Sequence, residues 1–194
     1  MTGILILAAG ESARLGQPKQ NLIFKDRTLL QRAVETAFAS ICQPIIVMLG
    51  ANEALIRPTI NQYPVKIFSN ADWGEGIASS IRLGVKELKL MAGITSVILM
   101  LCDQPFITTS LLNELAERGA DANIVACAYN GTRGVPVLFS SAYFDEILQL
   151  TGDEGAKKLL LKYSDEVTTI PFQLGDIDID TMEDFERSIT IAPN

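Results

Sequence analysis

The feature that most constrains the fold is an alternation of short, continuously apolar segments with amphipathic ones. The apolar segments are rich in β-branched residues and recur as ILILAA from residue 4, PIIVMLG from 44, VKIFSN from 65, SVILMLCD from 96, NIVACAY from 123 and VTTIPF from 167. Continuous apolar runs are typical of strands covered on both faces, as in a parallel sheet. They predict a three-layer α/β/α fold with a mostly parallel, Rossmann-like sheet.

The segments between these strands have the spacing of amphipathic helices. Residues 29–41, 77–88 and 111–116 place apolar side chains on one helical face, and Thr28 and Gln31 have the spacing of a capping box. This strand–helix order predicts right-handed crossovers between parallel strands. Because no linker, charge block or repeat interrupts the series, we expect a single domain over residues 1–194.

Cysteine usage and the amino-terminal sequence indicate the cellular compartment of the protein. Cys42, Cys102 and Cys127 are odd in number and lie in apolar stretches, unlike a disulfide framework or a CxxC metal site. The apolar run near the amino terminus is short, and no basic segment precedes it. We therefore expect reduced cysteines in a cytoplasmic protein that does not span a membrane.

Charge and histidine content restrict the chemistry. The net charge of −7 argues against a nucleic-acid-binding surface, which would concentrate lysine and arginine, so an anionic ligand needs a local site. The chain has no histidine, which excludes Ser/His and Cys/His pairs and histidine metal sites. Catalysis must therefore depend on carboxylates, lysine, arginine and backbone amides.

The first predicted strand leads into a glycine-containing loop that carries two cations, in the sequence LAAGESARLGQPK from residue 7. Small residues let backbone amides approach phosphate oxygens, and the cations neutralise their charge. The spacing is neither GxxxxGK[ST] nor GxGxxG, and an ordinary strand-to-loop turn is the alternative. The candidate phosphate-binding residues are Leu7, Ala8, Ala9, Gly10, Arg14 and Lys19.

Acidic residues follow two of the apolar segments. Asp103 directly follows SVILMLC, at the carboxyl end of a predicted strand, where open α/β sheets bind ligands. Asp178 and Asp180 precede a helix that Thr181 and Asp184 are spaced to cap. Turn and capping aspartates are the alternative to a role in binding metal or substrate.

The pattern LAAGxSxRxGxPK resembles the signature of the MobA/MocA-like nucleotidyltransferases. Blocks that resemble the rest of this family follow in order: NADWGEGIASSIRLGV from residue 70, LCDQPFI from 101, RGVPVLF from 133, GDEGAKKLL from 152 and DIDTMEDF from 178. The resemblance covers nearly the whole chain and implies the nucleotidyltransferase fold. The LAAG start, where guanylyltransferases have LAGG, is similar to MocA-type molybdenum cofactor cytidylyltransferases and favours CTP over GTP.

The resemblance also implies roles for individual residues. Asp103 and Asp180 would bind Mg²⁺, for which Mn²⁺ could substitute, and Asp178 is a reserve candidate. Catalysis would depend on Arg14, Lys19 and Asp103. The implied nucleotide-binding residues are Leu7, Ala8, Ala9, Gly10, Arg14, Lys19, Asn70, Gly76, Ser79 and Ser80. The implied acceptor-binding residues are Gln104, Gly134, Pro136 and Asp153.

The reaction that the resemblance implies is transfer of CMP from CTP to molybdenum-bound molybdopterin, which gives molybdopterin cytosine dinucleotide and pyrophosphate. The product would serve a molybdenum hydroxylase, with transient contact to that enzyme or its maturation factors. Val135, where several relatives have histidine or asparagine, leaves the acceptor open. The alternatives are another phosphorylated acceptor, a non-catalytic protein that binds or delivers molybdenum cofactor, and a purely structural α/β domain.

Overall fold

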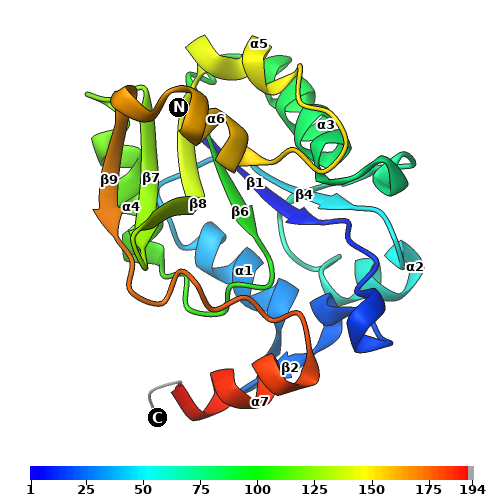
Figure 1. Ribbon diagram of the computed structural model, residues 1–194. Coiled ribbons are helices and arrows are strands. Elements are labelled where there is room, and N and C mark those ends of the chain that lie inside the picture. The colour runs from blue at the N-terminus through cyan, green and yellow to red at the C-terminus, as the bar shows by residue number, and fades with distance from the viewer. Residues whose placement is uncertain (192–194) are drawn as a thin grey trace.

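A twisted sheet forms the centre of the computed structural model, which describes residues 1–191 (Figure 1). Within that range the strand order is β5-β4-β1-β6-β8-β7-β9. The strands of this sheet are β1 Thr2–Ala8, β4 Ile45–Leu49, β5 Lys66–Ser69, β6 Ser96–Leu101, β7 Ile124–Tyr129, β8 Thr132–Ser140 and β9 Val167–Pro171. A separate hairpin pairs β2 Ile23–Phe24 with β3 Arg27–Thr28.

The sheet is mostly parallel, as the sequence predicts. β1 lies at its centre, where Ile6 is in register with Val47 of β4 and with Met100 of β6. The exception is β8, which pairs antiparallel with both β6 and β7. Its register against β7 shifts between Ala126 and Cys127, opposite the segment that contains Pro136. Proline has no backbone N–H to donate, and such an irregularity accommodates it within a strand.

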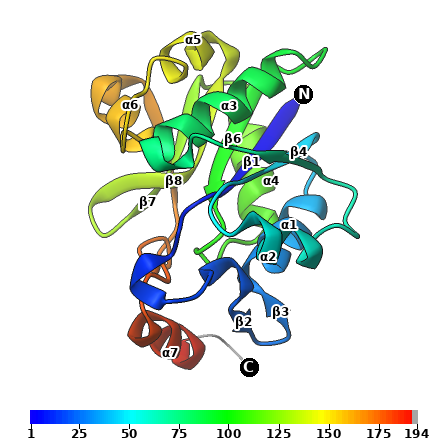
Figure 2. The same ribbon diagram turned by 90° about the vertical axis from the view of Figure 1, so that its right-hand side faces the viewer.

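Helices cover both faces of the sheet, which confirms the three-layer arrangement (Figure 2). The helices are α1 Leu29–Phe38, α2 Glu53–Ile56, α3 Ile77–Lys89, α4 Thr109–Arg118, α5 Phe144–Ile147, α6 Ala156–Lys162 and α7 Met182–Ile191. Ile4 and Ile6 of β1 pack in the core with α1, α2 and α4, whereas Leu5 and Leu7 pack with α3, α5 and α6. The continuous apolar strands are therefore buried on both sides.

The first helix begins as predicted but ends earlier. Thr28 and Gln31 form both bonds of the capping box: the Gln31 N–H donates to Thr28 Oγ1 at 3.1 Å, and the Thr28 N–H donates to Gln31 Oε1 at 3.0 Å. The helix stops at Phe38, three residues before the predicted end. There the Ala37 carbonyl accepts from the Ser40 hydroxyl at 2.6 Å and from the Ser40 N–H at 3.1 Å, and the Ile41 N–H donates to Asn113 Oδ1 at 2.9 Å instead of continuing the helix.

The segment after β9 runs back towards the part of the chain between β1 and α1. After β9, residues 172–181 lead to α7, which lies near the β2–β3 hairpin (Figure 1). Ile179 is fully buried with Phe24 and Leu29, and its N–H donates to the Asp103 carbonyl at 3.1 Å. This connection brings the carboxylates on either side of Ile179 to the end of β6.

No helix within residues 1–191 has the length and apolarity needed to cross a membrane. Cys42, Cys102 and Cys127 are buried and carry free thiols, as the sequence predicts.

Candidate active site

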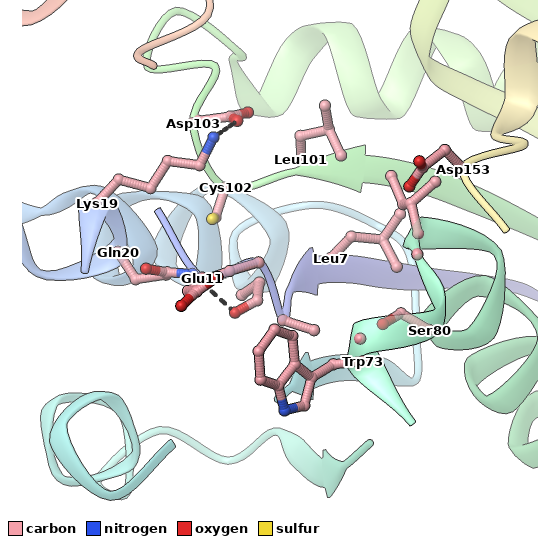
Figure 3. A pocket seen from close by; sticks show the side chains of 16 residues that line it. Leu7, Glu11, Lys19, Gln20, Trp73, Ser80, Leu101, Cys102, Asp103 and Asp153 are labelled. Carbon is pink, nitrogen blue, oxygen red and sulfur yellow. Dashed lines mark hydrogen bonds and ion pairs between the residues drawn. The ribbon is translucent and has the colours of Figure 1, made fainter. Parts of the chain in front are cut away.

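A cavity of about 380 Å³ opens where β1 and β6 end, at the carboxyl edge of the parallel strands (Figure 3). Parallel strands direct the loops that follow them to this edge, which is where such sheets bind ligands. The predicted site residues that line the cavity are Leu7, Ala8, Ala9, Gly10, Lys19, Gly76, Ser80, Asp103 and Asp153. Residues far apart in the sequence therefore meet in one place.

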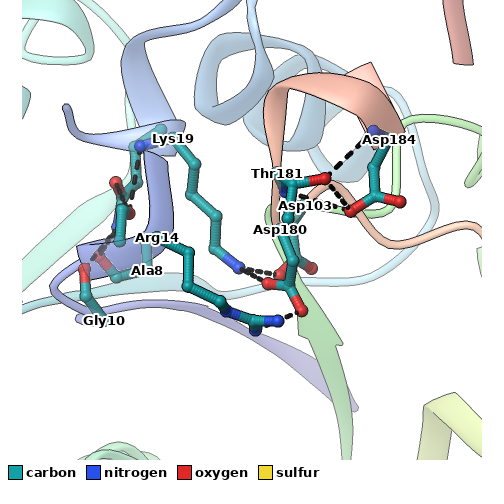
Figure 4. Close-up of polar contacts among 10 residues, drawn as sticks. Ala8, Gly10, Arg14, Lys19, Asp103, Asp180, Thr181 and Asp184 are labelled. Carbon is teal, nitrogen blue, oxygen red and sulfur yellow. Dashed lines mark hydrogen bonds and ion pairs between the residues drawn. The ribbon is translucent and has the colours of Figure 1, made fainter. Parts of the chain in front are cut away.

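Lys19 connects two predicted carboxylates at one end of this cavity (Figure 4). Its Nζ donates to Asp103 Oδ2 at 2.5 Å and to Asp180 Oδ1 at 2.9 Å. The other oxygen of Asp180 accepts from Arg14 Nη2 at 2.7 Å. Arg14 does not line the cavity but joins the same network from its exposed side. The two cations and two carboxylates thus form a continuous chain of ion pairs.

The charged groups in this network shift one another's pKa values. Burial alone would lower the pKa of Lys19, but the charge and hydrogen bond of Asp103 outweigh it and raise the pKa. Partial burial of Asp180 acts to raise its pKa, but the hydrogen bond and charge of Lys19, assisted by Arg14, make the net shift a lowering. Both shifts keep the ion pair charged at neutral pH.

Asp178 lies near this network without joining it. The residue is exposed, yet surrounding protein removes enough water from its carboxylate to raise the pKa, and the negative charge of Asp103 adds to the effect. A hydrogen bond with Gln104 acts in the opposite direction, and the resulting pKa is about 6. A cation placed among these carboxylates would relieve the repulsion.

The donor set fits a hard divalent cation. Asp103 Oδ1 is buried and, within the part of the chain that the structure describes, has no hydrogen-bond partner. An unpartnered carboxylate oxygen beside Asp180 offers the oxygen ligands that Mg²⁺ and Mn²⁺ take. Residues 1–191 contain no group of three acidic or cysteine side chains close enough to hold a metal alone. Phosphate oxygens and water would therefore complete the coordination, as is usual for Mg²⁺.

The helix α3 begins at the opposite wall of the cavity. Gly76 precedes it with φ 120°, and a side chain there would overlap the Gly152 carbonyl, so this position requires glycine. Ser80 lines the cavity, whereas Asn70 and Ser79 do not. Asn70 is buried, and its amide donates to the hydroxyls of Ser79 and Ser80 at 2.8 and 2.9 Å. Asn70 therefore holds the first turn of α3 through buried hydrogen bonds and does not face the cavity.

A second cavity of about 360 Å³ adjoins the first. Leu7, Ile77, Leu101 and Asp153 line both, so Asp153 lies at their junction. Of the predicted acceptor-binding residues, Gly134 also lines the second cavity.

Two predicted acceptor-binding residues line neither cavity. Pro136 is buried within β8. Gln104 is buried and donates from Nε2 to the Gly175 carbonyl at 2.9 Å. The structure therefore places both behind the cavity walls.

Several cavity-lining residues were not predicted. Trp73, the only tryptophan in the chain, and Gln20 line the first cavity, and Arg133 and Lys157 line the second. Trp73 and Arg133 stand within sequence blocks already noted for their family resemblance, which is the signal that could have identified them. Lys157 also stands within such a block, GDEGAKKLL, whereas Gln20 lies just outside the first block and only tertiary packing brings it to the cavity.

An open, mostly parallel α/β sheet with charged side chains in a cavity at its carboxyl edge is the arrangement in which doubly wound α/β proteins bind ligands such as nucleotides. The model of the MobA-like NTP transferase domain matches residues 4–167. The chain therefore belongs to the MobA-like NTP transferase family, a family of nucleotidyltransferases.

Relatives of this chain have different names. It is 29% identical to nicotine blue oxidoreductase of Paenarthrobacter nicotinovorans, over 96% of this chain and 95% of that protein. It is 28% identical to molybdenum cofactor cytidylyltransferase of Escherichia coli K12, over 93% and 92%. The crystal structure of Rv0371c from Mycobacterium tuberculosis H37Rv superposes with a TM-score of 0.85, at 28% identity and 97% coverage of both chains. Rv0371c has also been solved in complex with manganese.

Proposed function

We propose that the protein transfers CMP from CTP to molybdenum-bound molybdopterin and releases pyrophosphate. The observation that carries the proposal is the network of Lys19, Arg14, Asp103 and Asp180 at the end of the first cavity. It provides cations for a triphosphate and carboxylates for a divalent metal within one site. The related cytidylyltransferase and the LAAG start of the loop support CTP and this acceptor.

In the proposed reaction, an oxygen of the acceptor's terminal phosphate attacks the α-phosphorus of CTP in line. A new P–O bond forms, the bond from the α-phosphorus to the bridging oxygen of the β-phosphate breaks, and pyrophosphate leaves with that electron pair. The attacking phosphate is already ionised, so the reaction needs no general base. A chain without histidine can therefore perform this chemistry by positioning and charge neutralisation.

Each part of the site has a proposed task. Arg14 and Lys19 neutralise the triphosphate and the departing pyrophosphate, and the backbone of residues 7–10 borders the nucleotide. Asp103 and Asp180 hold Mg²⁺ or Mn²⁺, which would supply Lewis-acid stabilisation of charge on the phosphate oxygens. Ser80 and Gly76 contact the nucleoside from the opposite wall, and Asn70 and Ser79 support them.

The acceptor is proposed to occupy the second cavity. Asp153, at the junction with the first cavity, and Gly134 border it, while Gln104 and Pro136 support its walls. Arg133 and Lys157 give it positive charge, which suits an anionic acceptor. The acceptor's phosphate would then reach the α-phosphorus across the junction.

A panel of nucleotides tests the proposal. Magnesium-dependent pyrophosphate release is measured from CTP, GTP, ATP and UTP, each with and without molybdenum-bound molybdopterin. The proposal predicts release with CTP and only when this acceptor is present. Release with another phosphorylated acceptor would reassign the acceptor, and tight binding of molybdopterin without release would indicate a delivery protein.

A second candidate function follows from the relative named as an oxidoreductase, which is as similar to this chain as the cytidylyltransferase is. If the cavity bound a redox dinucleotide, the protein would oxidise a reduced nicotinamide cofactor when a suitable electron acceptor is present. The same panel is therefore run with NADH and NADPH. Cofactor oxidation without pyrophosphate release from any nucleotide would favour this candidate.

A further inference from the structure

Gln20 is fully buried beside the first cavity, with 0% of its surface exposed. Its amide nitrogen donates to the carbonyl oxygens of Ala8 at 2.9 Å and Gly10 at 3.0 Å (Figure 3). Its amide oxygen accepts from the Ser12 hydroxyl at 3.3 Å. Burying an amide costs free energy unless its donors and acceptor are bonded, and here both donors and the acceptor are used. The side chain is therefore held in one orientation.

Two of these bonds fix the backbone of the loop. The peptide group is planar and trans, so each N–H points opposite to the C=O of the same peptide group. Because Gln20 holds the Gly10 carbonyl, the N–H of Glu11 is directed away from Gln20. The bond to the Ala8 carbonyl fixes the end of β1 in the same way. Gln20 thus sets how the loop presents its backbone amides.

The same side chain also fixes the position of Lys19. Lys19 and Gln20 are neighbours in a short 3-10 turn, Lys19–Asn21, and their side chains reach different partners. The Lys19 N–H donates to the Ser12 hydroxyl at 3.0 Å, and that hydroxyl donates to Gln20. The Lys19 side chain extends to Asp103 and Asp180. Ser12 and Gln20 therefore tie the glycine-containing loop to the residue that carries the ammonium group.

We propose that Gln20 is a positioning residue for the triphosphate. It holds the loop backbone and Lys19 in the one arrangement in which amides and ammonium group meet the same phosphate oxygens, and it does not itself contact the substrate. The inference rests on the proposed function only in taking a nucleoside triphosphate as the ligand.

The test measures CTP binding by Gln20→Met in the presence of magnesium and without acceptor. Trp73 is the only tryptophan and lines the same cavity, so its fluorescence reports binding directly. We expect CTP to bind about tenfold more weakly, because the loop and Lys19 lose their shared anchor. The KM for CTP should rise to match, while the KM for the acceptor stays unchanged. Gln20→Glu, which sets a carboxylate against two carbonyl oxygens, should weaken binding at least as much.

Gln31→Met is the matched control. Gln31 accepts from the Thr28 N–H and donates to the Thr59 carbonyl, each at 3.0 Å, and lines neither cavity. This variant should lower the melting temperature and leave CTP binding unchanged. A folded Gln20→Met protein with wild-type CTP affinity would overturn the proposal.

If Gln20→Met does not fold, Ser12→Ala decides the question, because it removes only the hydroxyl that links Lys19 to Gln20. Weaker CTP binding by this variant supports the proposal, and unchanged binding overturns it. A wild-type protein that binds CTP but transfers nothing would contradict the proposed function alone, since the titration still decides the role of Gln20. A wild-type protein that binds no nucleoside triphosphate would contradict both.

Discussion

At the scale of single residues, Lys19 is paired with the two carboxylates that are proposed to hold a metal ion. Its ammonium group bonds to both Asp103 and Asp180, and Arg14 takes the remaining oxygen of Asp180. These cations balance the negative charge of the carboxylates. In the proposed function, a bound triphosphate would offer the two cations new partners, and the carboxylates would become available to a metal ion. Metal and nucleotide should therefore bind cooperatively.

The first prediction concerns Lys19→Met. Removing one oriented electrostatic contact should raise the activation barrier by about 3 kcal/mol, which slows pyrophosphate release roughly 100-fold. Without nucleotide, however, the variant should bind Mn²⁺ more tightly than the wild type, because its carboxylates have lost their competing cation. Electron paramagnetic resonance of Mn²⁺ measures this affinity. Lys86→Met removes the same charge from an exposed position on α3 and should change neither quantity; equal Mn²⁺ affinity in all three proteins would refute the competition.

The second prediction concerns Cys102, which lines the cavity next to Asp103. Burial raises the pKa of its thiol to about 12, the charge of Asp103 adding to the effect, so the group stays neutral and is a poor nucleophile at pH 8. An unfolded chain ionises this thiol near its ordinary pKa of 9.0. The neutral Cys102 thiol therefore makes its full contribution to the free energy of unfolding below pH 9, and this contribution is lost as pH rises towards 12.

Thiol reagents test this directly. Native protein at pH 8 should react slowly with a disulfide reagent at all three cysteines, since Cys42 and Cys127 are buried too. Protein unfolded in urea should react completely. Fast labelling of one thiol in the native protein, assigned to Cys102 by peptide mapping, would show that the cavity admits the reagent and ionises this group.

At the scale of elements, the capped start of α7 positions Asp180, which precedes the helix, in the site. Thr181 and Asp184 cap the helix reciprocally: the Asp184 N–H donates to Thr181 Oγ1 at 3.2 Å, and the Thr181 N–H donates to Asp184 Oδ2 at 3.0 Å. Ile179, on the other side of Asp180, is fully buried. A fixed residue on each side therefore holds the carboxylate towards Lys19 and Arg14.

The third prediction is that Thr181→Ala loosens this arrangement. Loss of a helix cap costs about 1 kcal/mol of stability, and the magnesium concentration needed for half-maximal activity should increase because Asp180 is less well held. Thr28→Ala removes the equivalent cap of α1 and should lower stability without changing the magnesium requirement. Thermal unfolding and a magnesium titration of each variant provide the comparison. If both variants required the same magnesium concentration, the cap of α7 would have no role in metal binding.

The elements also show what the sequence could predict. The glycine-containing loop, Asp103 at the end of β6 and the capping box at Thr28 depend on local patterns, and the structure has them where predicted. The antiparallel strand β8 was not predicted as a strand, because Gly134 and Pro136 interrupt its apolar run and it pairs through an irregular register. Long-range packing decides such features, and local periodicity does not report it.

At the scale of the whole molecule, the fold brings cationic side chains and carboxylates from distant parts of the chain to two adjoining cavities. The chain has a net charge of −7, yet Lys19 lines the first cavity with Arg14 in the same ion-pair network, and Arg133 and Lys157 line the adjoining cavity. Of the residues that line the second cavity, Gly134 and Asp153 were predicted as acceptor-binding residues, whereas Arg133 and Lys157 were not. The sequence predicted the family and the first cavity's main residues, whereas the internal roles of Asn70 and Gln20 required the structure.

Transfer of a nucleotidyl group at this site is tested most directly with CTP labelled at its α-phosphate. The protein is incubated with labelled CTP, magnesium and molybdenum-bound molybdopterin, and the label is followed into products. The account predicts that the label appears in the acceptor, with one pyrophosphate released for each label transferred, and that Asp103→Asn strongly reduces both. Label that remains in CTP, or that appears only as free CMP, would contradict the account.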